Sequence, residues 1–68
     1  MKLYITIGPT YLWENDITAT SNTRIATIAG ESFIQPLEEI YPYHSTLVPV
    51  LTHTGRIGYI FGSDLRKI

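Results

Sequence analysis

The sequence predicts an all-β fold, a single small domain built from five or six short strands. Of its 68 residues, 21 are β-branched and eight are aromatic, and both residue types suit a pleated, half-buried surface. No segment keeps an i, i+3, i+4, i+7 apolar pattern for three helical turns. Because an open sheet of short strands would leave two long edges, we expect closure into a small barrel or a pair of orthogonal sheets.

The first strand is expected at residues 2–7, where apolar and polar side chains alternate. Gly8-Pro9 ends it, since proline cannot donate to a ladder and Gly-Pro marks a turn. An extended segment resumes at residues 11–13. The long polar stretch at 14–23 then predicts a loop.

The middle of the chain predicts two more strands. Residues 24–28 form a short apolar strand, and 29–31 a turn in which Gly30 is expected to take a positive φ. Residues 32–38 alternate imperfectly, and Pro36 predicts an edge or a bulge there. A second loop, rich in aromatic residues, is expected at 39–45.

The C-terminal third predicts a hairpin. Residues 46–52 form one strand, 53–55 a tight turn and 56–60 the return strand. Residues 61–64 then predict a single helical turn, and 65–68 a last short strand.

Composition argues against several classes of protein. The net charge is −1, and hydrophobic residues make up 44% of the chain against 16% charged, a balance that does not favour disorder. The basic excess of a nucleic-acid binder is missing, so that partner is not expected. No apolar run approaches the ~18 residues of a membrane span. Cysteine is absent, which excludes disulfides and thiolate metal sites.

The N-terminus is not expected to be a targeting signal. Its apolar stretch stops at Gly8-Pro9, and no small-residue cleavage site follows. We therefore expect a cytoplasmic location in the producing or host cell.

Catalysis and metal binding are not expected. His44 and His53 are the ordinary general-base candidates, and no nucleophile motif accompanies them. These two histidines are nine residues apart, and together with Glu38 and Glu39 they lack metal-ligand spacing. We therefore expect a protein that is not an enzyme and has no cofactor or metal.

Three motifs carry a resemblance to a known family. Residues 25–33 (IATIAGESF) show an apolar strand, Gly-Glu and a further strand. Residues 54–60 (TGRIGYI) show a glycine turn before a Gly-aromatic-aliphatic strand, and 61–65 (FGSDL) a short turn before an apolar residue. In this order they resemble the diverging turn, distal hairpin and 3₁₀ turn of bacterial-type SH3 (SH3b) domains, within the SH3-like barrels.

The resemblance implies an SH3-like barrel over residues 10–68, with one 3₁₀ turn near the C-terminus. Residues 1–9 then add an N-terminal strand to the same single domain, 1–68. The loop at 14–23 corresponds to the family's RT loop. Where the family usually opens the next strand with a bulky aromatic residue, this chain has His44-Ser45-Thr46-Leu47, so the polyproline groove is not carried over.

The aromatic residues predict a binding surface. In the family the RT loop, the second loop and the 3₁₀ turn converge on one face, and tyrosine and tryptophan dominate binding hot spots. We expect Phe33 and Tyr59 in the core. The residues that fall at loops or strand ends are Tyr11, Trp13, Tyr41, Tyr43 and Phe61, and the expected patch combines Tyr11, Trp13, Tyr43 and Phe61, flanked by His44. The alternative is that Trp13 and Phe61 fill the core.

Acidic residues lie beside this surface in the sequence. Glu14 and Asp16 follow Trp13 in the loop at 14–23. Carboxylates there can pair with arginine or lysine of a ligand, and the alternative is that they only solvate a polar loop.

These observations predict a non-catalytic protein-binding module whose partner is another protein or its own copies. Its size suits a small phage or mobile-element protein that binds a host or virion protein, which would make it virion-associated. An alternative is a structural subunit of a phage particle or homo-oligomer, in which residues 2–7 add to a neighbour's sheet edge. A further alternative is a cell-wall-binding SH3b domain.

Overall fold

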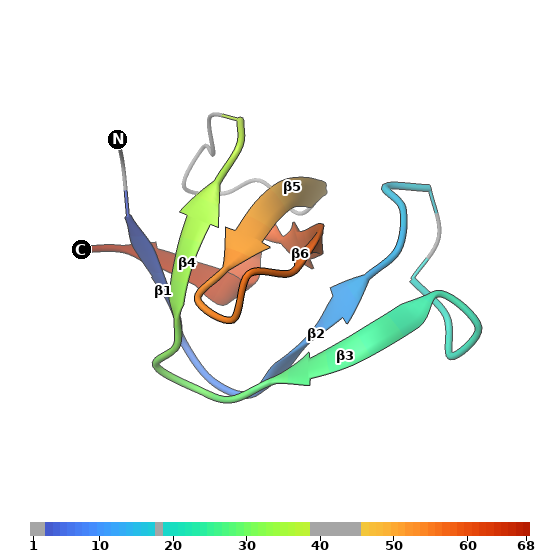
Figure 1. Cartoon of the computed structure of the whole chain (residues 1–68), viewed down its shortest axis with the longest axis horizontal. Coiled ribbons are helices and arrows are strands. Elements are labelled where there is room, and N and C mark those ends of the chain that lie inside the picture. The colour runs from blue at the N-terminus through green and yellow to red at the C-terminus, as the bar shows by residue number, and fades with distance from the viewer. Residues whose placement is uncertain (1–2, 18, 39–45) are drawn as a thin grey trace.

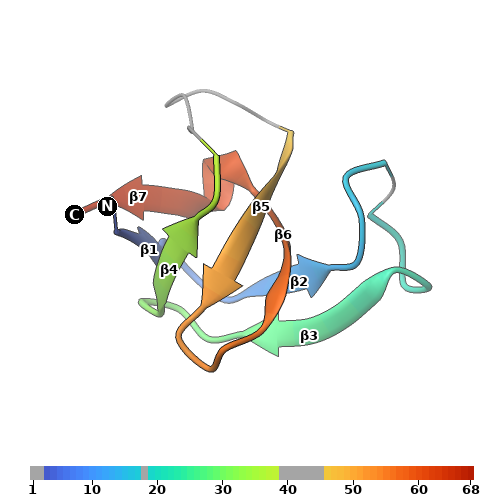
Figure 2. The same cartoon turned by 45° about the horizontal axis from the view of Figure 1, so that its top comes forward.

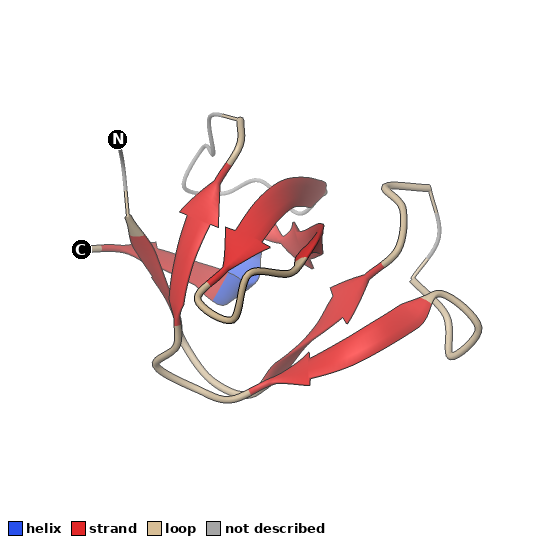
Figure 3. Cartoon of the chain, in the orientation of Figure 1, coloured by secondary structure: helices blue, strands red, loops and turns tan. Residues whose placement is uncertain are grey.

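The computed structural model describes residues 3–17, 19–38 and 46–68. These residues form an all-β structure, as the composition predicted, and Figure 3 shows that strands dominate it. The structure has seven strands within the described residues. The elements are β1 (Tyr4–Thr6), β2 (Thr10–Trp13), β3 (Arg24–Ile28), β4 (Phe33–Pro36), β5 (Leu47–Thr52), β6 (Ile57–Phe61), the 3₁₀ turn η1 (Gly62–Asp64) and β7 (Leu65–Lys67).

All seven strands belong to one antiparallel sheet with the order β3-β2-β6-β5-β4-β1-β7. The sheet is not closed, so the expectation of a closed cylinder is wrong. Six of the described strands, β2 to β7, lie within residues 10–68, which agrees with the expected five or six. Within this sheet, β2 and β6 share a single ladder pair, Trp13 with Tyr59. The β2–β3 hairpin therefore turns away from the other strands (Figure 1), and β3 and β7 remain as the two edges.

Both edges carry features that discourage unwanted pairing. In β7, Arg66 and Lys67 are exposed charged residues. On β3, the carbonyl of Ile25 accepts a hydrogen bond from the Arg56 guanidinium at 3.1 Å.

The N-terminal strand lies inside the sheet. Tyr4 pairs with Ile34 of β4 on one side and with Lys67 of β7 on the other, and Figure 2 shows β1 between these two strands. Both edges of β1 are therefore used within the chain. Edge pairing with a neighbour, the role considered for residues 2–7, is not open to this strand as it is folded.

The core lies on one face of the sheet. Its buried cluster takes one side chain from each of the seven described strands: Tyr4, Leu12, Ile28, Ile34, Val50, Ile60 and Leu65. Phe33 and Tyr59, expected in this core, point to the other face. Phe33 is 52% exposed because its neighbour Ile34 takes the inward position, and in a strand successive side chains alternate between faces.

A buried hydroxyl fixes the turn between β3 and β4. The Thr6 side chain donates to the carbonyl of Ala29 at 2.9 Å and accepts from the backbone N–H of Ser32 at 2.9 Å. The positive φ in this turn belongs to Glu31, at 57°, and not to Gly30 as expected. Gly30 is needed for a different reason, since a Cβ there would lie 3.2 Å from the Cα of Gly8.

The prolines fit the sheet without breaking a ladder. Pro36 was expected at an edge or a bulge, yet β4 is an interior strand. It is tolerated because it is the last residue of β4, beyond the ladder with β1. The Pro49 carbonyl bonds to the N–H of Leu37 just past the end of β4. The nitrogen of Pro49 points to the same neighbour, β4, as its carbonyl does. Because β4 ends at Pro36, the N–H that proline lacks would lie beyond the β4–β5 ladder, and no ladder bond is lost.

The C-terminal elements agree with the sequence prediction. The tight turn at 53–55 places Gly55 at φ 85°, and the 3₁₀ turn η1 follows β6 directly. This turn is tied to the N-terminal part of the chain by two bonds to Asp64. The Thr10 hydroxyl donates to its carboxylate at 2.9 Å, and the N–H of Ile7 donates to its backbone carbonyl at 2.9 Å.

Candidate functional site

Three aromatic side chains form a row on the face of the sheet opposite the core. Tyr11 and Trp13 come from β2, and Phe61 is the last residue of β6. The rings of Tyr11 and Trp13 are 5.7 Å apart between centroids, and those of Trp13 and Phe61 are 6.5 Å apart. Both pairs meet edge to face, at 72° and 73°, the arrangement that ring quadrupoles favour. We call these three residues the ring cluster.

Strand register explains why these rings meet. Tyr11 and Trp13 are two residues apart on β2, so they share one face. Trp13 pairs with Tyr59 of β6, and Phe61 lies two residues further along that strand on the same face. The cluster therefore depends on the one ladder pair that joins β2 to β6.

A cation lies over the outer end of the ring cluster. The guanidinium carbon of Arg24, in β3, is 4.5 Å from the centroid of the Tyr11 ring. Such a contact stabilises by about 0.5–1 kcal/mol at an exposed site. Tyr11 is 40% exposed, so this end of the cluster presents an aromatic edge and a positive charge to solvent.

Trp13 occupies the middle of the cluster and is 9% exposed. Trp13 is one of the buried hydrophobic side chains, as the alternative that it fills the core expects, but it is not a member of the cluster of seven core residues. Its indole Nε1 is buried and has no hydrogen-bond partner within the described part of the chain. A buried donor without an acceptor costs about 1–3 kcal/mol.

The acidic loop follows the ring cluster directly. Glu14 and Asp16 are both exposed, and the backbone N–H of Glu14 is bonded to the carbonyl of Thr23 at 2.8 Å, which closes the base of the loop. Carboxylates are therefore available beside the rings, as the sequence suggested. The remaining predicted site residues, Tyr41, Tyr43 and His44, lie outside the described residues.

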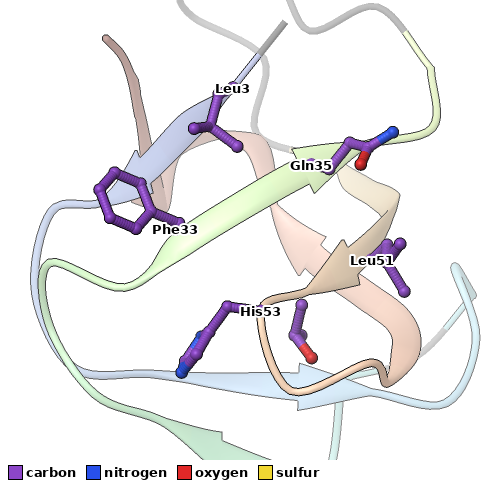
Figure 4. Close-up of a pocket in the computed structure, with 6 residues that line it drawn as sticks. Leu3, Phe33, Gln35, Leu51 and His53 are labelled. Carbon is purple, nitrogen blue, oxygen red and sulfur yellow. The ribbon is translucent and has the colours of Figure 1, made fainter. Parts of the chain in front are cut away.

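A second feature of the same face was not predicted. A hollow of about 130 Å³ lies over β4 and β5 (Figure 4) and is lined by Leu3, Phe33, Gln35, Leu51, Thr52 and His53. The signal in the sequence was the alternation of Phe33 with Gln35 and of Leu51 with His53, which places each pair on one face of a strand. The sequence does not show which residues of the two strands lie opposite each other. In the structure Gln35 of β4 pairs with Leu51 of β5, and this register brings the two pairs of side chains together.

The described residues include no group of three or more histidine, cysteine, aspartate or glutamate side chains that could hold a metal ion. Within the same residues, no helix has the length and apolar character needed to cross a membrane. No family model, curated protein or solved structure matches the chain. The site is therefore interpreted from its own geometry.

Proposed function

We propose that the chain is a non-catalytic module that binds another protein through the ring cluster and the acidic loop beside it. The observation that carries this proposal is the edge-to-face row of Tyr11, Trp13 and Phe61 on the outer face. Aromatic side chains give large contact area at low cost in conformational entropy. A row of three, joined from two strands, supplies the central anchor that protein interfaces use.

The unpartnered indole of Trp13 supports the same proposal. Its N–H is buried and has no acceptor among the described residues. A partner whose binding displaces the side chains that cover this donor, and brings a carbonyl or carboxylate oxygen to it, relieves the cost of leaving it unpaired. This predicts a protein segment that presents an acceptor next to apolar side chains.

The acidic loop sets the charge that such a partner should carry. Glu14 and Asp16 lie exposed immediately after Trp13. A basic side chain of the partner can pair with either carboxylate while its apolar neighbours contact the rings. At the other end of the surface lies the positive charge of Arg24, whose guanidinium carbon is 4.5 Å from the centroid of the Tyr11 ring.

Our proposal includes a relation to the SH3-like barrels. The loop at 14–23, the hairpin turn at 53–55 and the 3₁₀ turn at 62–64 follow one another in the order of that family, which supports it. The open, seven-stranded sheet is a departure from it. The chain is therefore related to this family in the order of its elements and in the position of the ring cluster beside the long loop, and not in the closure of the sheet.

Capture from a bacterial lysate tests the binding proposal. The immobilised wild type should retain a partner that Tyr11→Ala and Phe61→Ala lose by about tenfold or more, because each removes a ring from the anchor. Ile25→Ala is the matched control, since Ile25 is 41% exposed against 40% for Tyr11 and lies on the neighbouring strand. Equal capture by all three variants would contradict the proposal.

A further inference from the structure

The β2–β3 loop carries a protruding apolar side chain that follows two acidic residues, Glu14 and Asp16. Ile17 is 84% exposed, more than any other large hydrophobic side chain among the described residues. Its backbone N–H donates to the Asn15 side-chain oxygen at 2.9 Å, which holds the loop tip in an Asx turn. Ile17 therefore projects as a knob directly after the exposed carboxylate of Asp16.

The hollow over β4 and β5 has the size and lining to receive such a knob. Its volume is about 130 Å³, and it is open to solvent, so a side chain from outside can enter it. In Figure 4, Leu3 and Phe33 lie along one side of it, with Leu51 of β5 and His53 of the turn that follows β5 on the other. The lining offers three apolar side chains and, at the rim, the imidazole of His53.

Charge distinguishes the two surfaces. None of the seven described strands contains an acidic residue, and the described carboxylates all lie in loops or in η1. Arg66 pairs with Ile5, which pairs with Phe33, so Arg66 lies on the same face as the hollow. The face of the hollow therefore carries the positive charge of Arg66, and the loop that ends in Ile17 carries the carboxylates of Glu14 and Asp16.

The knob and the hollow lie at opposite ends of the molecule. Figures 1 and 2 both show the β2–β3 loop at one end of the long axis and β1 and β4 at the other, where β4 and the residue before β1, Leu3, line part of the hollow. The chain measures 31 Å along its longest axis. Ile17 therefore cannot fill the hollow of its own molecule.

We infer that copies of this chain associate head to tail, with Ile17 of one copy seated in the hollow of the next. The Asp16 carboxylate then accepts a hydrogen bond from the His53 ring N–H, a donor in either charge state of the imidazole. The contact joins two different surfaces, so it forms open chains or rings and not a symmetric pair. It uses neither the edges of β1 nor the ring cluster.

Sedimentation of two complementary variants tests this inference. Ile17→Asp removes the knob and leaves the hollow, and Phe33→Asp places a carboxylate in the hollow and leaves the knob. Wild type should grow beyond a dimer as its concentration rises, whereas each variant alone should stay monomeric. An equimolar mixture of the two should form a dimer and nothing larger, because only one intact contact can exist in it.

Three controls keep the result interpretable. Leu37→Asp alters a side chain 50% exposed that does not line the hollow, so association should be unchanged. Tyr11→Ala should leave association unchanged as well, which separates this inference from the proposed binding function. Gln35→Glu introduces the carboxylate without a change of volume and should weaken association by about fivefold through repulsion of Asp16, even if Phe33→Asp does not fold.

Several results would overturn the inference. A wild type that remains monomeric at every concentration would do so, because the two surfaces would then not recognise each other. A mixture of the two variants that stays monomeric, or an Ile17→Asp variant that associates as wild type does, would show that another surface carries the contact.

Discussion

Leu12 and Gly58 lie so close together that position 58 has no room for a side chain. A Cβ at Gly58 would stand 2.5 Å from Cγ of Leu12 and 2.7 Å from its Cδ1. Leu12 is completely buried, so it cannot move out of the way. This contact presses β2 onto β6 at the point where only one ladder pair joins them, and the ring cluster on the other face depends on the same junction.

We predict that Gly58→Ala destabilises the protein by about 1–3 kcal/mol, the cost of overpacking a filled core. Urea unfolding monitored by circular dichroism measures this change. In a Leu12→Ala background the penalty should shrink, because the shorter side chain leaves space for the new methyl group. A penalty of the same size in both backgrounds would show that Leu12 is not its cause.

The hairpin turn at 53–55 gives a second prediction. Gly55 has a φ of 85°, which costs other residues about 1–2 kcal/mol. Gly55→Ala should therefore lower the free energy of unfolding by about this amount. Gly8→Ala is the matched control, because a Cβ there meets nothing within 4 Å and φ is not in the positive region. A comparable loss from both substitutions would argue against backbone strain.

A third prediction concerns the buried hydroxyl of Thr6. In the wild type the Thr6 hydroxyl accepts a hydrogen bond from the N–H of Ser32 at 2.9 Å. Thr6→Val keeps the shape of the side chain but leaves this N–H without an acceptor. We expect a loss of about 1–3 kcal/mol in the free energy of unfolding. Thr6→Ser retains the hydroxyl and should lose clearly less, and equal losses would mean that the lost bond does not matter.

The indole of Trp13 gives a fourth prediction. Trp13→Phe keeps an aromatic ring in the cluster and removes the unpartnered N–H. The volume lost and the unsatisfied donor removed have opposite effects, so stability should stay within about 1 kcal/mol of wild type. Capture of the partner should nevertheless fall by about tenfold, because the donor is missing. Trp13→Ala should instead cost about 3 kcal/mol or more.

The positions of most strands could be predicted from the sequence because the signals are local. β3 occupies the residues expected for it, and the 3₁₀ turn falls within the predicted segment. Glycine and proline turns and alternating side chains act over a few residues, so they identify an element without knowledge of its neighbours.

The arrangement of the strands could not be predicted in the same way. The burial of Ile34 in place of Phe33 depends on its partners, Tyr4 and Thr52, which are distant in sequence. A shift of one residue exchanges the two faces of a strand. Whether β3 and β7 meet is likewise decided by the twist of the whole sheet, and no local pattern reports it.

The same distinction between local signals and long-range register applies to the candidate site. The meeting of Tyr11, Trp13 and Phe61 was expected from the resemblance, which brings the first loop and the 3₁₀ turn to one face. The hollow was missed because it is made by the register between β4 and β5, with Gln35 opposite Leu51. Tyr41, Tyr43 and His44 lie outside the described residues, and their place in the site stays a prediction.

The central claim is that Trp13 and its neighbouring rings receive the partner protein. Because the chain has a single tryptophan, its indole N–H gives one signal in a nitrogen–proton NMR spectrum of the labelled protein. On addition of the partner captured from the lysate, we predict that this signal shifts, together with the backbone amides of Tyr11 and Phe61. A partner that binds while the indole signal stays in place and the amides around Phe33 and Leu51 shift would contradict the account.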